Sequence, residues 1–127
     1  MKIKIEKTSN DGNETQVDFL SDYGRSAALW IGAPPTLGEL YDVELKIDDD
    51  LVWGEGISKT TKGRASITLE EGMFVVVGSV ISLEEDCCLS IAVGDSLILL
   101  NVKNAPEDIP GLVECRALVV KLYSTNL

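Results

Sequence analysis

The stretch Tyr41–Ile47 reads YDVELKI and is the clearest strand in the sequence. Its aromatic and aliphatic residues fall on odd positions and its charged residues on even positions, which is the period of two expected for a half-buried β-strand. Shifting its pairing by one residue would bury Asp42 and Glu44, so we expect its register to be well fixed. This segment predicts a sheet with one face on the core and an acidic face toward solvent.

The same alternation recurs on both sides of this strand. Residues Ile3–Lys7 and Thr15–Phe19 flank a segment rich in turn formers, with Asp11-Gly12 near its tip, and predict a β-hairpin. Met73–Leu83 is almost continuously apolar and is predicted as a long central strand, buried on both faces over part of its length. Further strands are expected at Leu51–Trp53, Ala65–Leu69, Cys87–Val93, Ser96–Val102 and Leu112–Tyr123.

The breaks between these segments predict how the chain is organised. Pro34 and Pro35 cannot donate backbone hydrogen bonds, so the chain should leave the sheet there. Asp48–Asp50 is predicted as the tip of a hairpin whose return strand begins at Leu51. Ser21–Leu29 is the best candidate for a helix, although a Tyr-Gly pair within it weakens the helical pattern.

Together these segments predict an all-β fold: a single small antiparallel barrel or sandwich, OB-like or similar, with about nine strands and at most one short helix. The first strands are too few to be stable alone, so we expect residues 1–127 to form one domain. Residues 73–123, predicted as strand, strand, strand, loop and strand, resemble part of an OB-like barrel.

The charge of the chain narrows its partners. It has 21 acidic and 11 basic side chains and a net charge of −10. Such a surface repels nucleic-acid phosphates and anionic lipid and attracts basic proteins. We therefore expect a basic protein partner, no nucleic acid and no membrane, and the sequence leaves the oligomeric state open.

The apolar runs and the cysteines predict a cytoplasmic location. The longest apolar runs are far shorter than the roughly 20 residues that span a bilayer, and the alternating start of the chain does not resemble a signal peptide. Cys87, Cys88 and Cys115 cannot all pair within the chain, so we expect small apolar side chains in a reducing compartment. A Cys88–Cys115 bridge is the alternative.

The residue types that are missing point away from catalysis. The chain has no histidine, which removes the commonest general base and the usual zinc ligand. Gly54-Glu55-Gly56 is not followed by a predicted helix, so it does not indicate a phosphate loop. We expect no enzyme activity, no cofactor and no metal, although a site built from two carboxylates alone remains an alternative.

The candidate binding residues come from the most acidic stretch, residues 39–56, in which seven carboxylates and one lysine give a net charge of −6. The alternatives are a solvated outer face and, for Asp48–Asp50 with Glu55, a calcium site, whose spacing the stretch does not match. Among the aromatic residues, Tyr41 shares its strand face with aliphatic residues and is predicted to be core, whereas Trp53 is the better interface candidate. The predicted partner-binding residues are Asp42, Glu44, Asp48, Asp49, Asp50, Trp53 and Glu55.

Two functions from different classes follow. The first is a non-catalytic binding protein whose acidic face covers a basic partner, and in size, acidity and missing catalytic residues the chain is similar to bacterial immunity and antitoxin proteins that block a toxin domain. The second is an OB-like β-barrel module that binds a peptide, sugar or other small ligand. A structural subunit of an oligomer is a third alternative.

Overall fold

The computed structural model describes residues 1–109 and 111–125. In this part of the chain all regular secondary structure is β-strand. The all-β prediction is confirmed, and Ser21–Leu29 forms the end of one strand, a turn and most of the next strand rather than a helix. The described strands number twelve instead of about nine. They are β1 (Lys2–Asp11), β2 (Glu14–Ser21), β3 (Gly24–Ile31), β4 (Leu40–Ile47), β5 (Asp50–Trp53), β6 (Gly56–Lys59), β7 (Ser66–Glu70), β8 (Met73–Leu83), β9 (Cys88–Val93), β10 (Ser96–Lys103), β11 (Leu112–Ala117) and β12 (Val120–Ser124).

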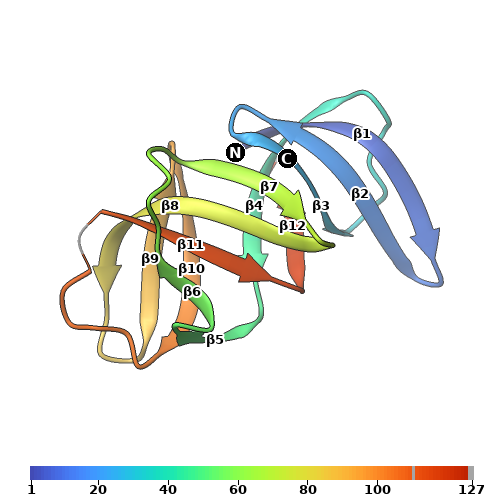
Figure 1. Cartoon of the computed structure of the whole chain (residues 1–127). Coiled ribbons are helices and arrows are strands. Elements are labelled where there is room, and N and C mark those ends of the chain that lie inside the picture. Colours follow the sequence, from blue (N-terminus) through green and yellow to red (C-terminus); the bar gives the residue numbers. More distant parts are fainter. Residues whose placement is uncertain (110, 126–127) are drawn as a thin grey trace.

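The strands close into two small barrels rather than one (Figure 1). Barrel A consists of β1, β2, β3, β12 and β4, and it closes because β4 pairs with β1. Barrel B consists of β11, β6, β5, β10, β9 and β8, and it closes because β11 pairs with β8; β7 is an additional strand on β8. The prediction of a barrel is confirmed. The purely antiparallel order is corrected, because β3–β12, β5–β10 and β5–β6 are parallel pairs.

The chain crosses between the barrels twice, and both crossings correct a prediction. Asp48–Asp50 is not a hairpin tip, because β4 pairs with β1 and β12 in barrel A whereas β5 pairs with β6 and β10 in barrel B. Leu112–Tyr123 is not one strand, because it divides at Leu118–Val119 into β11 of barrel B and β12 of barrel A. Alternation of apolar and polar residues specifies which face of a strand is buried, but it does not specify the neighbouring strand.

The predicted faces and registers of the main strands are confirmed. β1 and β2 form the expected hairpin, with Asp11 opposite Glu14 across the turn. In β4 the side chains at positions 43, 45 and 47 are buried and those at 42, 44 and 46 are exposed. The residues Val75–Val77 of β8 are all buried, as expected for a strand covered on both faces.

One hydrophobic cluster runs through both barrels. Phe19 of barrel A and Phe74 of barrel B meet with their ring centroids 6.4 Å apart. On one side the barrels also join along a seam between β3 and β7, where the amide of Ile67 donates to the carbonyl of Tyr23 at 2.9 Å. A Cβ atom on Gly24 would collide with the carbonyl oxygen of Ile67, so this close approach requires glycine.

Candidate functional site

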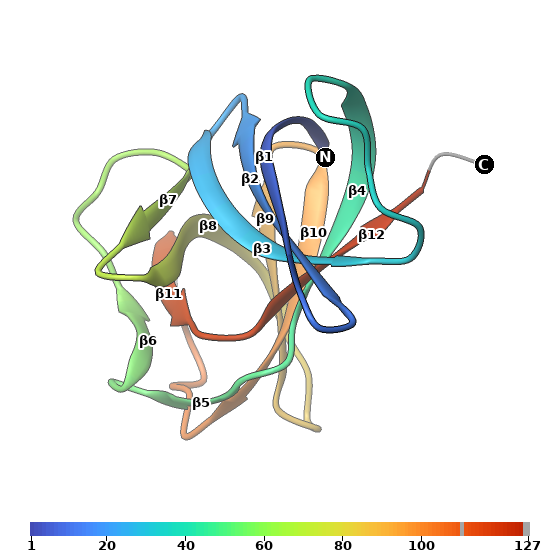
Figure 2. The same cartoon turned by 90° about the vertical axis from the view of Figure 1, so that its right-hand side faces the viewer.

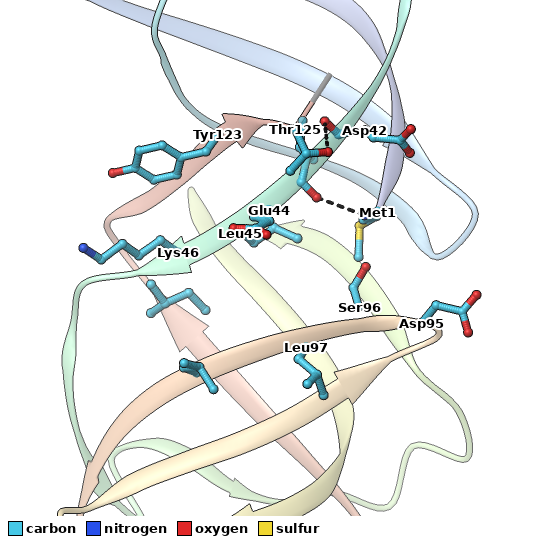
Figure 3. Close-up of a pocket in the computed structure, with 13 residues that line it drawn as sticks. Met1, Asp42, Glu44, Leu45, Lys46, Asp95, Ser96, Leu97, Tyr123 and Thr125 are labelled. Carbon is cyan, nitrogen blue, oxygen red and sulfur yellow. Dashed lines mark hydrogen bonds between the residues drawn. The ribbon is translucent and has the colours of Figure 1, made fainter. Parts of the chain in front are cut away.

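β4 and β10 lie next to each other on one side of the molecule (Figure 2). A groove of about 1080 Å³ lies between them, and Figure 3 shows its lining side chains. β4 forms one bank and β10 the other, and the turn between β9 and β10 closes one end. Its volume lies at the upper limit of pockets that hold small organic ligands, which makes it large enough for a peptide segment. The side chains that define its chemistry are Asp42, Glu44, Lys46, Asp95, Leu97 and Leu99.

The β4 bank is predominantly acidic. Asp42 and Glu44 face outward because the alternate residues of β4 are buried in barrel A, and Asp95 stands across the groove beside Ser96 (Figure 3). Within the described residues, none of these three carboxylates has a hydrogen-bond or ion-pair partner. Lys46 forms an ion pair with Asp48 at the crossing, with its Nζ 3.6 Å from Oδ1 of Asp48. The amino group of Met1 lies nearby and donates to the carbonyl of Val43 at 2.9 Å.

The β10 bank is apolar. Leu97 and Leu99 expose 60% and 59% of their surface, whereas Ile98 and Leu100 between and beyond them are buried in barrel B. Single exposed leucines are ordinary, but two on one strand that border the same groove form an apolar strip. The groove therefore combines unpaired carboxylates with exposed aliphatic side chains, a combination that suits a partner with both basic and apolar groups.

The side chains of the three consecutive aspartates form hydrogen bonds and ion pairs with other residues of their own chain. Both carboxylate oxygens of Asp49 accept backbone hydrogen bonds at 2.9 Å, one from the amide of Leu118 and one from that of Val119. These amides belong to the second crossing, Leu118–Val119, between β11 and β12. Asp49 therefore links this crossing to the first one, between β4 and β5. Asp50 accepts a hydrogen bond of 2.9 Å from the side-chain amide of Asn101, which joins β5 to β10.

Asp48 belongs to the same junction and forms ion pairs. Its Oδ2 lies 2.8 Å from Nζ of Lys121, and its Oδ1 lies near Lys46. The hydrogen bond from Lys121, with the charges of both lysines, lowers the pKa of Asp48 below its ordinary value of 3.8 against a smaller effect of desolvation. The same hydrogen bond raises the pKa of Lys121 above 10.5.

The structure therefore divides the predicted binding residues. Asp42 and Glu44 line the groove together, and Asp48, Asp49 and Asp50 lie at the crossing, with contacts to their own chain. Trp53 is half-buried and packs against the core. Glu55 is exposed in the turn between β5 and β6.

Sequence reasoning missed the other bank of the groove, formed by Asp95, Leu97 and Leu99. A signal was present, since residues 97–100 read LILL and place leucine or isoleucine on both faces of a strand. In a small closed barrel only one of those faces lies in the core, so the other must be exposed. The predicted strand was correct; its exposed apolar face is the feature that marks the site.

The remaining groups define what the molecule offers chemically. Among residues 1–109 and 111–125, no cluster of three or more histidine, cysteine, aspartate or glutamate side chains is placed to hold a metal ion. All three cysteines are free, and burial raises the pKa of the Cys115 thiol to about 12. In the same described part of the chain, no helix has the length and apolar character required to cross a bilayer.

Trp30 and Tyr41 are paired inside barrel A. Trp30 is buried, and its ring packs edge-on against that of the half-buried Tyr41, with centroids 5.0 Å apart. The indole N–H of Trp30 donates to the carbonyl of Ala33, and the Tyr41 hydroxyl accepts from the amide of Thr36. These rings hold the loop between β3 and β4.

Comparison with known proteins supplies no relative: no family model, no curated protein and no solved structure matches this chain.

Proposed function

We propose that this protein is a non-catalytic binding protein that receives a basic protein partner in the groove between β4 and β10. The observation that carries the proposal is that the groove is lined both by Asp42, Glu44 and Asp95, whose carboxylates have no partner in the part of the chain that the structure describes, and by the exposed side chains of Leu97 and Leu99. A carboxylate without an internal partner gains from a cationic one, and exposed leucines gain from being covered. Blocking a toxin domain, as bacterial immunity and antitoxin proteins do, is the biological role that this chemistry fits best.

The net charge supports a basic partner. With a net charge of −10, the whole molecule attracts a cationic protein before contact, and the groove then supplies the local match. Acidic surfaces of this kind raise association rates more than they raise final affinity, and added salt weakens the effect. We therefore expect fast, salt-dependent association with the partner.

The second candidate is an OB-like module for a peptide, sugar or other small ligand. The groove volume of about 1080 Å³ favours a peptide within that group. Barrel A closes with five strands, the number in an OB barrel, whereas barrel B closes with six. The groove, however, lies between the two barrels rather than on the face of one, and for this reason we rank the protein partner first.

Crosslinking from inside the groove identifies the partner. A photo-crosslinking amino acid placed at Leu97 should capture a basic protein in native cells. The matched control carries the same amino acid at Leu118, which is also an exposed leucine but lies at the crossing outside the groove. Capture of the same protein from both positions, or of acidic proteins only, would contradict a groove that selects a basic partner.

Charge removal then tests the mechanism with the captured partner. The double variant Asp42→Asn with Glu44→Gln should slow association about tenfold at low salt and weaken its salt dependence, because it removes the steering charges of one bank. Its free energy of unfolding should change by less than about 0.5 kcal/mol, since neither carboxylate has a partner within residues 1–109 and 111–125.

The matched control is Glu84→Gln with Glu85→Gln, which makes the same change in net charge in the turn before β9, at the other end of that strand from Asp95. Stopped-flow association of both double variants measures the difference. Equal slowing in the two would assign the effect to net charge alone and remove the groove from the proposal.

A further inference from the structure

The strands that border the groove leave part of their backbone without a neighbouring strand. β10 pairs with β9 over Ser96–Asn101, but on its other side it pairs with β5 only over Asn101–Lys103. On the edge of β10 opposite β9, residues 96–100 face the groove. In the described part of the chain no strand pairs with them there.

The ladder identifies which groups point into the groove. In an antiparallel pair, alternate residues exchange hydrogen bonds with the neighbour, and the residues between them direct their N–H and C=O groups to the opposite side. The amide of Val102 donates to the carbonyl of Cys87 at 2.9 Å, which assigns the even positions of β10 to the β9 ladder. The N–H and C=O groups of Leu97 and Leu99 therefore point into the groove.

The opposite bank shows the same arrangement. Met1 and Val43 exchange two backbone hydrogen bonds, of 2.8 and 2.9 Å, so the odd positions of β4 point away from β12. Leu45 and Ile47 share this direction, and among the described residues no strand pairs with them on that side. In the described part of the chain the groove is thus bordered on both sides by strand backbone that pairs with no other strand.

The β10 edge also lacks the usual protection against strand addition. Proteins commonly guard open edges with lysine, proline, a bulge or an inward-pointing charge. Residues 96–100 read SLILL and contain no charge and no proline. Their pairing with β9 is regular over its whole length, without a bulge. An unguarded edge inside a groove is the arrangement that domains use when they bind a partner segment as an added strand.

We infer that the partner enters this groove as an extended segment and adds as a β-strand to the edge of β10, hydrogen-bonded to Leu97 and Leu99. This inference rests on the proposed function and specifies its binding mode. Side chains of a strand alternate between its two faces. One set of the partner's side chains would point toward the core side of the groove, where Leu45 and Ile47 are already buried. The other set would lie on the outer face, beside Leu97 and Leu99 and within reach of Asp42 and Glu44.

The occupant is therefore a segment in which basic and apolar residues alternate. Charge argues against a second copy of this chain, because pairing two grooves would bring Asp42, Glu44 and Asp95 of each copy against the same carboxylates of the other. The net charge of −10 on each copy adds to this repulsion. A cationic segment meets neither obstacle.

Hydrogen exchange of the protein alone tests the open edge. The amides of Leu97 and Leu99 should exchange more than about tenfold faster than those of Ile98 and Leu100, which are bonded to β9. Equal protection of the four amides at low protein concentration would mean that the edge is already closed and would overturn the inference. Protection that rises with protein concentration would assign the edge to a second copy, which also overturns it.

A defined peptide tests the occupant. The probe is a peptide of about seven residues in which lysine and valine alternate, and its counterpart has glutamate in place of lysine. At about 1 mM the lysine peptide should slow exchange of the Leu97 and Leu99 amides about tenfold, and the glutamate peptide should leave them unchanged. No slowing with the lysine peptide, or equal slowing with both, would overturn the inference.

Substitutions at Leu99 separate backbone pairing from side-chain contact. Leu99→Pro removes an N–H that points into the groove and leaves the β9 ladder complete, so it should weaken binding of the lysine peptide about tenfold. Leu99→Thr also removes the leucine side chain but keeps that N–H, and it should weaken binding less than about threefold. Equal loss in both variants would mean that the side chain, not the backbone, makes the contact.

Methylated peptides keep the test decisive if Leu99→Pro fails to fold. Two versions of the lysine peptide carry N-methyl groups on alternate backbone amides, one in each frame, and at least one should bind the unaltered protein about tenfold more weakly. Two methylated peptides that bind like the parent would overturn strand addition.

Failure of this inference and failure of the proposed function have different signatures. If the captured partner binds Leu99→Pro normally but binds the Asp42→Asn, Glu44→Gln variant slowly, the partner uses the groove without adding a strand. If crosslinking yields no basic partner while the lysine peptide still protects Leu97 and Leu99, the groove accepts a strand but the proposed function is wrong.

Discussion

Asp42 and Glu44 lie before Ile47 in the sequence, Asp48–Asp50 lie after it, and the two acidic groups have opposite surroundings. The three aspartates of the crossing bind two backbone amides, two lysines and an asparagine of their own chain. The two groove carboxylates bind nothing among the described residues. The same residue type is structural at one end of a strand and available at the other, and the difference lies in what the fold places opposite each carboxylate.

This comparison has a thermodynamic meaning. A carboxylate that accepts hydrogen bonds within the native state stabilises that state, and its removal leaves donors behind. A carboxylate without a partner contributes little to folding and adds repulsion from its neighbours, so its removal should be neutral for the free energy of unfolding. Substitutions on the closed side of the molecule, where the barrels are joined, should therefore be costly, whereas those in the groove should not.

The largest effect on stability is expected at the seam between β3 and β7, where the two barrels are in contact. Gly24→Ala should lower the free energy of unfolding by about 3 kcal/mol, or roughly 10 °C in Tm, because the new methyl group would collide with the carbonyl of Ile67 and the φ of +135° is rare for alanine. Thermal unfolding followed by circular dichroism measures it.

The matched control is Gly12→Ala in the first hairpin turn. Gly12 also has a positive φ, of +65°, but no atom lies within 4 Å of the position its Cβ would take. Gly12→Ala should lower the free energy of unfolding by about 1 kcal/mol, which is the cost of placing alanine at a positive φ without any steric collision. Equal losses at the two glycines would show that the seam yields without cost and would weaken the description of that side as closed.

A moderate effect is expected at the crossing. Asp49→Ala should lower the free energy of unfolding by about 1.5 kcal/mol, because the amides of Leu118 and Val119 lose their acceptor. Asp49→Asn keeps one oxygen acceptor and should lose about half as much. Urea unfolding monitored by tryptophan fluorescence measures both variants.

Asp50→Ala is the comparison within the crossing, since among the described residues the Asp50 side chain accepts a hydrogen bond only from Asn101, and that bond is exposed. It should lose less than about 0.5 kcal/mol. A loss at Asp50 as large as that at Asp49 would contradict the assignment of Asp49 as the residue that fastens the two crossings.

The faces of the strands could be predicted from sequence, and the two-barrel arrangement could not. Tyr41–Ile47 alternates without interruption, and its buried and exposed faces follow directly. Nothing in that pattern says that the next strand belongs to another barrel, because Leu51 is buried in the same odd phase as Val43, Leu45 and Ile47. The neighbour of a strand is decided by contacts distant in sequence, which local alternation does not encode.

The second crossing left a signal that the first did not. In β11 the buried positions are odd (Val113, Cys115 and Ala117), whereas in β12 they are even (Val120 and Leu122). A change of phase inside an apolar run indicates that one strand has ended and another has begun. The groove is harder to infer, because its two banks, at residues 42–47 and 95–99, come from different barrels and become neighbours only after both have closed.

The smallest effect is expected from pH at the ion pair of the crossing. Lys121→Met removes the charge that lowers the pKa of Asp48 and keeps the aliphatic chain, and its cost should be about 2 °C in Tm or less at pH 7. Because the pKa of Asp48 is lower in the folded state than in the unfolded one, the ion pair stabilises the native state above pH 3.8. That stabilisation should disappear as the pH falls through the folded-state pKa below 3.8.

The difference in Tm between wild type and Lys121→Met should therefore close in acid. It should close again above pH 10.5, where Lys121, whose pKa is raised in the folded state, loses its proton. Lys59→Met removes the same charge from an exposed lysine that makes no ion pair in the described part of the chain, and its difference from wild type should show no such window. If both lysine variants give the same pH profile, the ion pair is a solvated contact without energetic consequence. Among the three aspartates, only Asp49 and Asp50 would then stabilise the crossing. They would do so through hydrogen bonds from backbone amides and the Asn101 side chain rather than through an ion pair.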